Sequence, residues 1–311
     1  MKLKRNKKLV RLIIEAAKQI SKITEKETGR KERGRPRQYP NYIFIAALLL
    51  KQLENLSLRE LEERLKELFP NSPDHTTLWY RFRKLSKEYL EELIKQSAKQ
   101  IKERLKAKEF FCIIADGTGF GYADTYKLSY KRGKELREVK SHVKTEVLIG
   151  LVRRKLVVLD VNVGSPYADE VVLLNPMLNS LEFRARYFLG DAYYDKVSVL
   201  KKVKDMNMHA VVPVKDTLRK KVRNPYRLWA KKNYEEEGEL YRKHRTSIER
   251  IIGMVKNAYG DRDWVKDFHV ASLYVLAKFA LYNLALLIEL LLLCFYLLKL
   301  HSYTLWFSML T

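Results

Sequence analysis

The chain has 311 residues and a formal net charge of +24, from 61 Lys and Arg against 37 Asp and Glu. With 12 Gly, 8 Pro and two cysteines, its composition excludes collagen-like and low-complexity chains, disulfide frameworks and Cys-based zinc modules. No apolar run follows the basic start MKLKRNKKLVR, so we expect no secretory signal and an intracellular protein. The charge favours a polyanionic partner, most simply nucleic acid. A ribosome-associated or membrane-surface protein stays open.

The first 40 residues are the most basic part of the chain, with 14 Lys and Arg against 4 Asp and Glu. Apolar spacing predicts a helix over residues 9–20, and residues 27–40 form a basic linker punctuated by Gly and Pro. The arginines of this linker suit the negative potential of a narrow minor groove: Arg33, Arg35 and Arg37. A solvated linker is an equally good interpretation.

Residues 41–108 have the pattern of a small helical bundle. An apolar helix is expected over 42–54, and the capping box Ser57-Leu-Arg-Glu60 opens a second helix that ends near Leu68. After a turn, a basic helix begins at His75, which gives a helix-turn-helix pattern. The basic residues that we expect to contact DNA there are Arg81, Arg83 and Lys84. An amphipathic helix over 87–108 links this region to the rest.

The pattern changes at Glu109, where strands and helices begin to alternate. Five apolar runs predict strands: 110–115, 146–152, 156–163, 186–190 and 209–214. Helices are expected over 169–178, 195–206 and 241–258, and residues 215–240 read as a polar stretch. This order predicts a mixed α/β sheet with flanking helices.

Two aspartates follow predicted buried strands directly: Asp116 after the first strand and Asp191 after the fourth. Strand ends are where open α/β sheets hold ligands. Each residue taken alone reads as a turn or cap residue, but the pair shares one kind of position in one sheet. Among the neighbouring acids, Asp160 is expected to face solvent and Asp169 to start a helix.

The predicted helix over 241–258 adds a third acid. Tyr241, Arg245, Glu249 and Lys256 fall on one face of such a helix. Together with the two aspartates, Glu249 gives three carboxylates, and hard divalent cations such as Mg²⁺ prefer oxygen ligands. Two such ions activate an attacking oxygen and stabilise a leaving oxygen at a phosphodiester, while Arg and Lys meet phosphate.

The ordered motifs resemble a known family. The segments ADGTGF, YFLGDAYYD and RTSIERIIGMVK, with the strands between them, resemble the RNase H-like core of DDE transposases of bacterial and archaeal insertion sequences. That family has a Tyr-x2-Arg-x3-Glu-x6-Lys signature, and Arg245, Glu249 and Lys256 match its last three terms. Tyr241 departs from it, because it stands one residue too early. The segments GRPRQYP and PDHTTLWYRFRK also resemble this group.

The resemblance implies a fold and an activity. The fold is an RNase H-like mixed five-stranded sheet with flanking helices, preceded by an all-α, helix-turn-helix-like domain. Asp116, Asp191 and Glu249 would bind catalytic Mg²⁺, or Mn²⁺, and Arg245 and Lys256 would contact DNA. The enzyme would cleave DNA at terminal inverted repeats and join 3′-OH ends to target DNA, as a homodimer during synapsis, in the cytoplasm at the nucleoid.

Three other functions stay open. They are a catalytically silent DNA-binding protein of transposase descent, a structure-specific nuclease and a membrane-anchored basic protein. The expected domains are a basic N-terminal helix and linker (1–40), a helical DNA-binding domain (41–108), an RNase H-like catalytic domain (109–288) and an apolar tail (289–311).

The apolar stretch 279–298 is long enough to span a membrane. Glu289 and Asn283 disfavour that interpretation, because a polar group inside a bilayer needs a partner. We therefore expect a helix of the protein core up to about Ile288 and no membrane partner. The sequence gives the tail 289–311 no function.

Overall fold

The computed structural model describes residues 7–28, 38–123, 127–132, 135–215 and 222–308, and the side chains of these ranges except 127–140 and 293–308. Arg33, Arg35 and Arg37 therefore lie outside the described residues, and their predicted contact with DNA stays a prediction.

The first part of the chain is helical, as predicted. Its helices are α1 (Lys7–Thr28), α2 (Asn41–Glu54), α3 (Leu58–Leu68), α4 (His75–Phe82) and α5 (Glu88–Arg104). The capping box is present: the Ser57 hydroxyl accepts from the backbone N–H of Glu60, and the Glu60 carboxylate accepts from that of Ser57. Asp74 caps α4 by accepting from the N–H of Thr77. The two caps fix where α3 and α4 begin.

Five strands form the central sheet, in the order β5-β4-β1-β6-β7. They are β1 (Phe110–Tyr122), β4 (His142–Val152), β5 (Lys155–Gly164), β6 (Ala185–Leu189) and β7 (His209–Val211). β4 runs antiparallel to β1 and β5, whereas β6 and β7 run parallel to β1. This is the RNase H-like arrangement, and the predicted fold class is confirmed. The two-residue strand β8 (Arg262–Asp263) adds to the far end of β1.

The first strand is longer than the sequence indicates. We expected it to end before Asp116, but β1 continues to Tyr122, paired with β4 throughout. The glycines after Asp116 are typical of a turn. In the structure they lie within the strand, and glycine is required there because neighbouring side chains fill the space that a Cβ would take. A Cβ at Gly117 would lie 2.7 Å from the Glu170 carboxyl carbon, and one at Gly119 would lie 2.9 Å from the His142 ring.

A hairpin and a helix were also not predicted from the sequence. The strands β2 (Lys127–Arg132) and β3 (Glu135–Lys140) form a separate two-stranded hairpin between β1 and β4. The supposed polar stretch 215–240 contains a helix, α8 (Pro225–Glu236), whose first N–H groups bond to the Asn224 side chain. Pro225 at its first position also favours a helix start.

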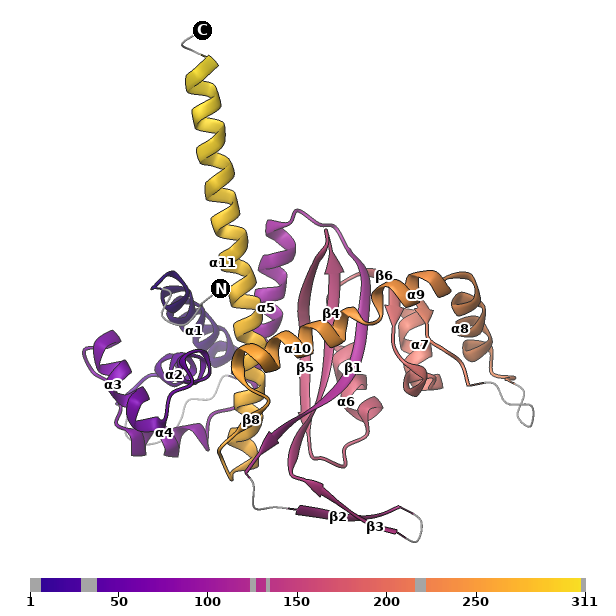
Figure 1. Cartoon of the computed structure of the whole chain (residues 1–311), viewed down its shortest axis with the longest axis horizontal. Helices are drawn as coiled ribbons and strands as arrows, with labels where there is room; N and C mark the ends of the chain where they lie inside the picture. The colour runs from indigo at the N-terminus through magenta and orange to yellow at the C-terminus, as the bar shows by residue number, and fades with distance from the viewer. Residues whose placement is uncertain (1–6, 29–37, 124–126, 133–134, 216–221, 309–311) are drawn as a thin grey trace.

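Helices cover both faces of the sheet (Figure 1). The helices α10 (Ser247–Tyr259) and α11 (Phe268–Ser308) lie with α5 on one face, and α6 (Glu170–Asn179) lies on the other. The helix α7 (Val197–Asp205) packs near α6, and α9 (Gly238–His244) precedes α10. The single helix expected over 241–258 is wrong: the backbone breaks into α9 and α10 at Arg245–Thr246.

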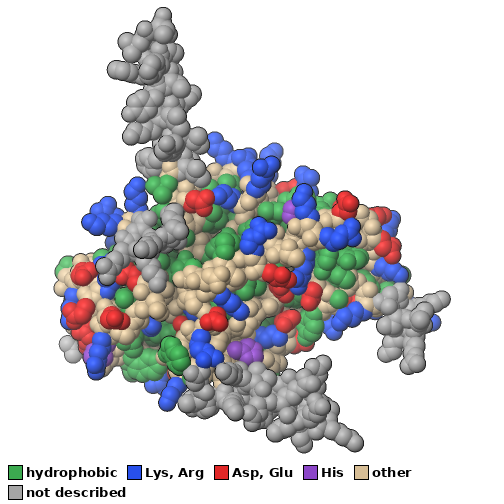
Figure 2. All heavy atoms as spheres, in the orientation of Figure 1, with side chains coloured by type: hydrophobic (Ala, Val, Ile, Leu, Met, Phe, Trp, Pro, Cys, Tyr) green, Lys and Arg blue, Asp and Glu red, His purple; other side chains and the backbone are tan. Residues whose placement is uncertain are grey.

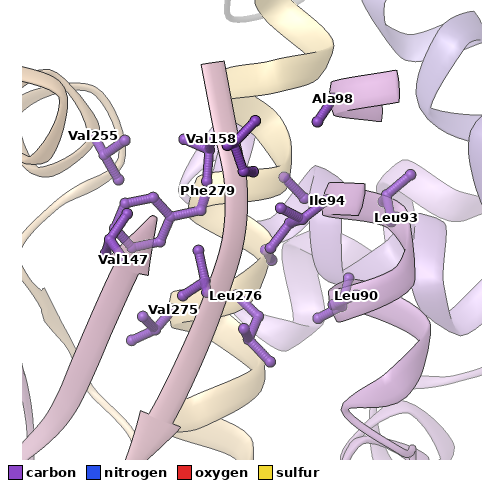
Figure 3. Packing of buried hydrophobic residues seen from close by; sticks show 14 of the residues in the cluster. Leu90, Leu93, Ile94, Ala98, Val147, Val158, Val255, Val275, Leu276 and Phe279 are labelled. Atoms are coloured by element: carbon purple, nitrogen blue, oxygen red, sulfur yellow. The ribbon is translucent and has the colours of Figure 1, made fainter. Parts of the chain in front are cut away.

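The core on the α5 side is centred on α11 (Figure 3). Phe279 of α11 lies among Val147 of β4, Val255 of α10 and Val158 of β5. Its ring also meets the Phe120 ring edge-on at 5.7 Å. These apolar contacts join α10 and α11 to the sheet face that also carries Asp116, since Asp116 is the register partner of Val147.

In the described part of the chain, one helix is long and apolar enough to cross a membrane, over Phe268–Leu292, and 72% of its window is buried inside the fold. The two polar side chains that disfavour a membrane span have partners within the protein. Asn283 donates to the Val158 carbonyl at 2.7 Å, and Glu289 pairs with Lys155 at 2.6 Å. The segment up to Leu292 is therefore a core helix, although α11 does not end near Ile288 as expected but runs on to Ser308 (Figure 1).

Candidate active site

The register of β1 and β6 brings the two aspartates together. The parallel pairing runs up to Ile114 opposite Leu189, and Asp116 and Asp191 each follow two residues later. Asp191 then starts a 3₁₀ turn, Ala192–Tyr194, in which its carboxylate accepts from the Tyr193 N–H at 2.8 Å. The prediction that Asp191 follows its strand is confirmed, while Asp116 lies inside β1 and not at its end.

Arg245 connects the first aspartate to the glutamate. Its Nη2 lies 3.5 Å from Asp116 Oδ2, and its Nη1 forms an ion pair with Glu249 Oε1. Arg245 keeps a right-handed helical backbone at the α9–α10 break, so the polar face carrying Arg245 and Glu249 continues across it. Figure 2 shows acidic and basic side chains interspersed over this face of the molecule.

The three carboxylates influence one another electrostatically. Burial raises the pKa of Asp116 to about 6, although Arg245 and the Gly117 N–H oppose this rise, and the charges of Asp191 and Glu249 add to it. The acids are thus close enough to repel each other, with one guanidinium among them. Such a group of carboxylates is short of positive charge.

Tyr241 faces the same group. Burial raises the pKa of its hydroxyl first, and the charges of Asp191 and Asp116 contribute to the rise. Its ring packs edge-on against Tyr234 at 5.1 Å. The one-residue shift from the family signature therefore does not remove this tyrosine from the site.

A comparison with known families identifies the chain. The model of the family described as Transposase DDE domain matches residues 112–284, which covers more than half of the chain and all three acids. The chain belongs to the DDE transposase family. An uncharacterized protein of Aquifex aeolicus (strain VF5) is 59% identical to this transposase over 300 residues, which cover 96% of this chain and 93% of that protein.

Among solved structures, this transposase is similar to two transposase complexes. In the Drosophila P element transposase strand transfer complex the identity is 14% and the TM-score 0.27, over 62% of this chain and 42% of that chain. In the Mos1 strand transfer complex the identity is 11% and the TM-score 0.30, over 84% of this chain and 80% of that chain. The transposase thus spans less than half the length of the P element chain.

Lys256 lies apart from the three acids of the transposase. It follows Glu249 by two helical turns, about 10 Å along α10. Its Nζ lies over the Phe120 ring at 5.1 Å, and burial lowers its pKa. Because Phe120 follows Asp116 by four residues on the same face of β1, α10 runs beside this strand, with Glu249 near one end and Lys256 near the other.

The basic residues predicted on α4 and just after it are placed differently from one another. Arg83 and Lys84 are exposed, as contacts to DNA require. Arg81 instead reaches into the helical bundle, where it donates to Asn41 Oδ1 at 2.7 Å and lies over the Phe44 ring at 5.0 Å. Its placement favours a structural role.

A buried pair beneath the site was missed by sequence reasoning. Glu146 of β4 is fully buried opposite Gly117, and the Tyr194 hydroxyl donates to its Oε1 at 2.7 Å. Burial raises the pKa of Glu146 well above the usual value, although the Tyr194 bond opposes this. The bond ties β4 to the turn that carries Asp191. The only signals in the sequence were an acid opening an apolar strand and the second tyrosine of DAYYD.

The donor set fits a hard divalent cation in its chemistry. All three acids offer carboxylate oxygens, which are the ligands that such a cation prefers. In the present side-chain arrangement, the described residues contain no three His, Cys, Asp or Glu placed to hold one ion. Arg245 occupies the space between Asp116 and Glu249, so its movement toward a phosphate would leave both carboxylates available.

Proposed function

We propose that this transposase is a Mg²⁺-dependent enzyme that binds the terminal inverted repeats of an insertion sequence, cleaves the DNA and joins the freed 3′-OH ends to target DNA. One observation carries this proposal. The register of β1 and β6 places Asp116 near Asp191, and Arg245 pairs with both Asp116 and Glu249. Three acids that are distant in the sequence are thereby linked: one inside β1, one just after β6 and one on α10.

The roles of the residues follow from their surroundings. Asp116, Asp191 and Glu249 would hold the metal, which when bound activates the attacking oxygen and stabilises the leaving oxygen. Arg245, between two of these acids, would turn to a phosphate oxygen when DNA enters, because a guanidinium forms paired hydrogen bonds to phosphate. Tyr241 on α9 would border the site, because the charges of Asp191 and Asp116 act on its hydroxyl.

The family match to a transposase domain supports DNA as the partner, and the net charge of +24 suits a polyanion. A dimer during synapsis follows from the reaction itself, because two DNA ends must be held together. We also propose that the protein acts in the cytoplasm, on DNA of the nucleoid.

The test is cleavage of plasmid DNA that carries the two ends of the element. The wild-type protein should cut at those ends with Mg²⁺ or Mn²⁺ and not with EDTA. Asp116→Asn, Asp191→Asn and Glu249→Gln should each lower the rate by about a thousandfold or more, because metal catalysis supplies several kcal/mol. Asp205→Asn, an exposed acid at the end of α7, is the matched control and should retain full activity.

Other outcomes would select a different function. Binding of the ends without cleavage under any metal would favour a catalytically silent DNA-binding protein. Cleavage of junctions or RNA–DNA hybrids without joining would favour a structure-specific nuclease. Cleavage that survives Asp116→Asn would overturn the assignment of the site.

A further inference from the structure

The turn after β8 presents one large aromatic side chain to solvent. Trp264 is 80% exposed, more than any other large hydrophobic residue that the structure describes. The guanidinium of Arg262 lies over its ring at 6.0 Å. Exposing an indole ring to water is unfavourable. A tryptophan that is held exposed at a fixed position therefore suggests that its ring binds a ligand.

The turn that carries Trp264 is anchored on both sides. Asp263 is buried and accepts from Lys278 Nζ at 2.7 Å and from Gln52 Nε2 at 3.3 Å. On the other side, Asp267 pairs with Arg83, just after α4, at 3.2 Å. The exposure of Trp264 is therefore built into a fixed turn held by α2, α4 and α11.

The surface around this turn combines aromatic rings with cations. On α4, Tyr80 is 54% exposed, and Lys84 Nζ lies over its ring at 4.1 Å. Lys87 Nζ lies over the ring of Phe268, the first residue of α11, at 5.7 Å. Figure 1 shows α4, β8 and the start of α11 along the same lower edge of the molecule.

This combination suits nucleic acid better than a protein. Proteins that bind unpaired DNA stack bases on aromatic rings and hold the backbone with Lys and Arg. A protein-binding surface of the same size would have a contiguous apolar centre depleted of charge. Here each ring has a cation over it: Arg262 over Trp264, Lys84 over Tyr80 and Lys87 over Phe268.

The turn lies at a defined distance from the site. β8 pairs with β1 at Gly121 and Tyr122, so Trp264 follows a point six residues beyond Asp116 on the strand. At about 3.3 Å per residue this is about 20 Å. A stacked DNA strand covers the same length with about six nucleotides at 3.4 Å each.

We propose that Trp264 stacks on an unpaired base of the DNA strand, about six nucleotides from the phosphate that is cut at Asp116. The inference rests on the proposed function for the position of the cut, but base stacking itself needs no cleavage. The protein would thus hold DNA whose strands are opened locally beside the active site.

The first test uses binding without metal. A single-stranded dT20 with one 2-aminopurine reports stacking by quenching of its fluorescence, and EDTA suppresses cleavage. Trp264→Ala should weaken binding about tenfold and abolish the quenching, whereas Trp264→Phe should retain most of both. Val172→Ala, an exposed apolar side chain on α6, is the control and should behave as wild type. Equal affinity and quenching in wild type and Trp264→Ala would overturn the proposal.

The second test places 2-aminopurine at successive positions of a DNA end. The probe should be quenched most at about six nucleotides from the cut, and this maximum should vanish in Trp264→Ala. A wild-type protein that cleaves the end but shows no Trp264-dependent maximum would overturn the inference and leave the proposed function intact. A wild-type protein that binds dT20 through Trp264 but cuts no DNA would count against the proposed function alone.

Self-association lost in Trp264→Ala, with DNA binding unchanged, would assign the surface to a second copy of the chain and overturn the proposal.

Discussion

Several carboxylates of this transposase are buried with too few partners to offset the cost of desolvating their charge. Asp116 pairs with one guanidinium, that of Arg245, which also pairs with Glu249. Glu146 has one oxygen, Oε2, without a hydrogen-bond partner. Such groups reduce stability when they are charged, because desolvation favours the neutral form. In Asp116 this cost coincides with the proposed site, which is where perturbed carboxylates are usually found.

Asp160 offers a test of this cost away from the site. The expectation that it faces solvent is wrong: it is buried on β5, 3.5 Å from Lys95, and burial raises its pKa to about 6. A carboxyl whose folded pKa lies above its unfolded value stabilises the fold fully below about pH 4 and loses this contribution as the pH rises through 6.

Asp160→Asn should therefore be more stable relative to wild type at pH 7.5 than at pH 4. The difference should be on the order of 3 kcal/mol, since each pKa unit corresponds to about 1.4 kcal/mol. Urea denaturation at the two pH values measures it. Glu92→Gln, a half-buried acid nearby on α5, serves as the control. A gap that does not change with pH would contradict the burial of this carboxyl as a charged group.

At the scale of elements, α11 and β8 are joined by one buried ion pair. Lys278 is fully buried, and its Nζ donates to Asp263 Oδ2 at 2.7 Å and to the Gly260 carbonyl at 2.9 Å. Through Gln52, the same aspartate also contacts α2. This network attaches the helical part of the chain to the end of β1.

Removing one member of this pair should cost more than removing both. Lys278→Met leaves the buried Asp263 without the ammonium that pairs with it, and we expect a loss of about 3–5 kcal/mol in the free energy of unfolding. The double variant Lys278→Met/Asp263→Asn should recover a large part of that loss. Denaturation of wild type, Lys278→Met, Asp263→Asn and the double variant measures the coupling, and a double variant whose loss equals the sum of the two single losses would contradict it.

The elements show what the sequence could and could not predict. The apolar runs predicted every strand of the main sheet except β8, because buried strands have continuous hydrophobicity. Gly117 and Gly119 ended the predicted strand early, since turns and crowded strands both require glycine, and only the neighbours Glu170 and His142 distinguish the two. The helix α8 was missed because its surface is polar and its few buried residues, Ala230 and Asn233, give no apolar period.

The candidate site could be predicted only in part, because it depends on contacts between residues that are distant in the sequence. The acids follow from motif order, but whether Asp116, Asp191 and Glu249 meet depends on the pairing of β1 with β6 and on α10. Glu146 and Tyr194 could not be found, because their role depends on a bond across 48 positions of sequence.

For the whole molecule, the net charge of +24 sets how binding of DNA depends on salt. If six to ten phosphates are neutralised, affinity for duplex DNA should fall by about 10³–10⁵ between 50 and 200 mM salt. Titration of a labelled duplex at four salt concentrations measures the slope. Arg83→Ala should reduce the slope by about one phosphate, whereas Arg186→Ala, on β6 and outside the helices predicted to bind DNA, should not. A slope near zero would contradict DNA as the partner.

The claim that everything else depends on is the meeting of three carboxylates around metal ions. A crystal structure of the protein with Mn²⁺ and a cut DNA end, measured at the manganese absorption edge, tests it directly. We expect anomalous peaks within about 2.0–2.3 Å of oxygens of Asp116, Asp191 and Glu249, with Arg245 turned away from Asp116. Peaks bound to other residues, or carboxylates that stay apart while cleavage proceeds, would contradict the account.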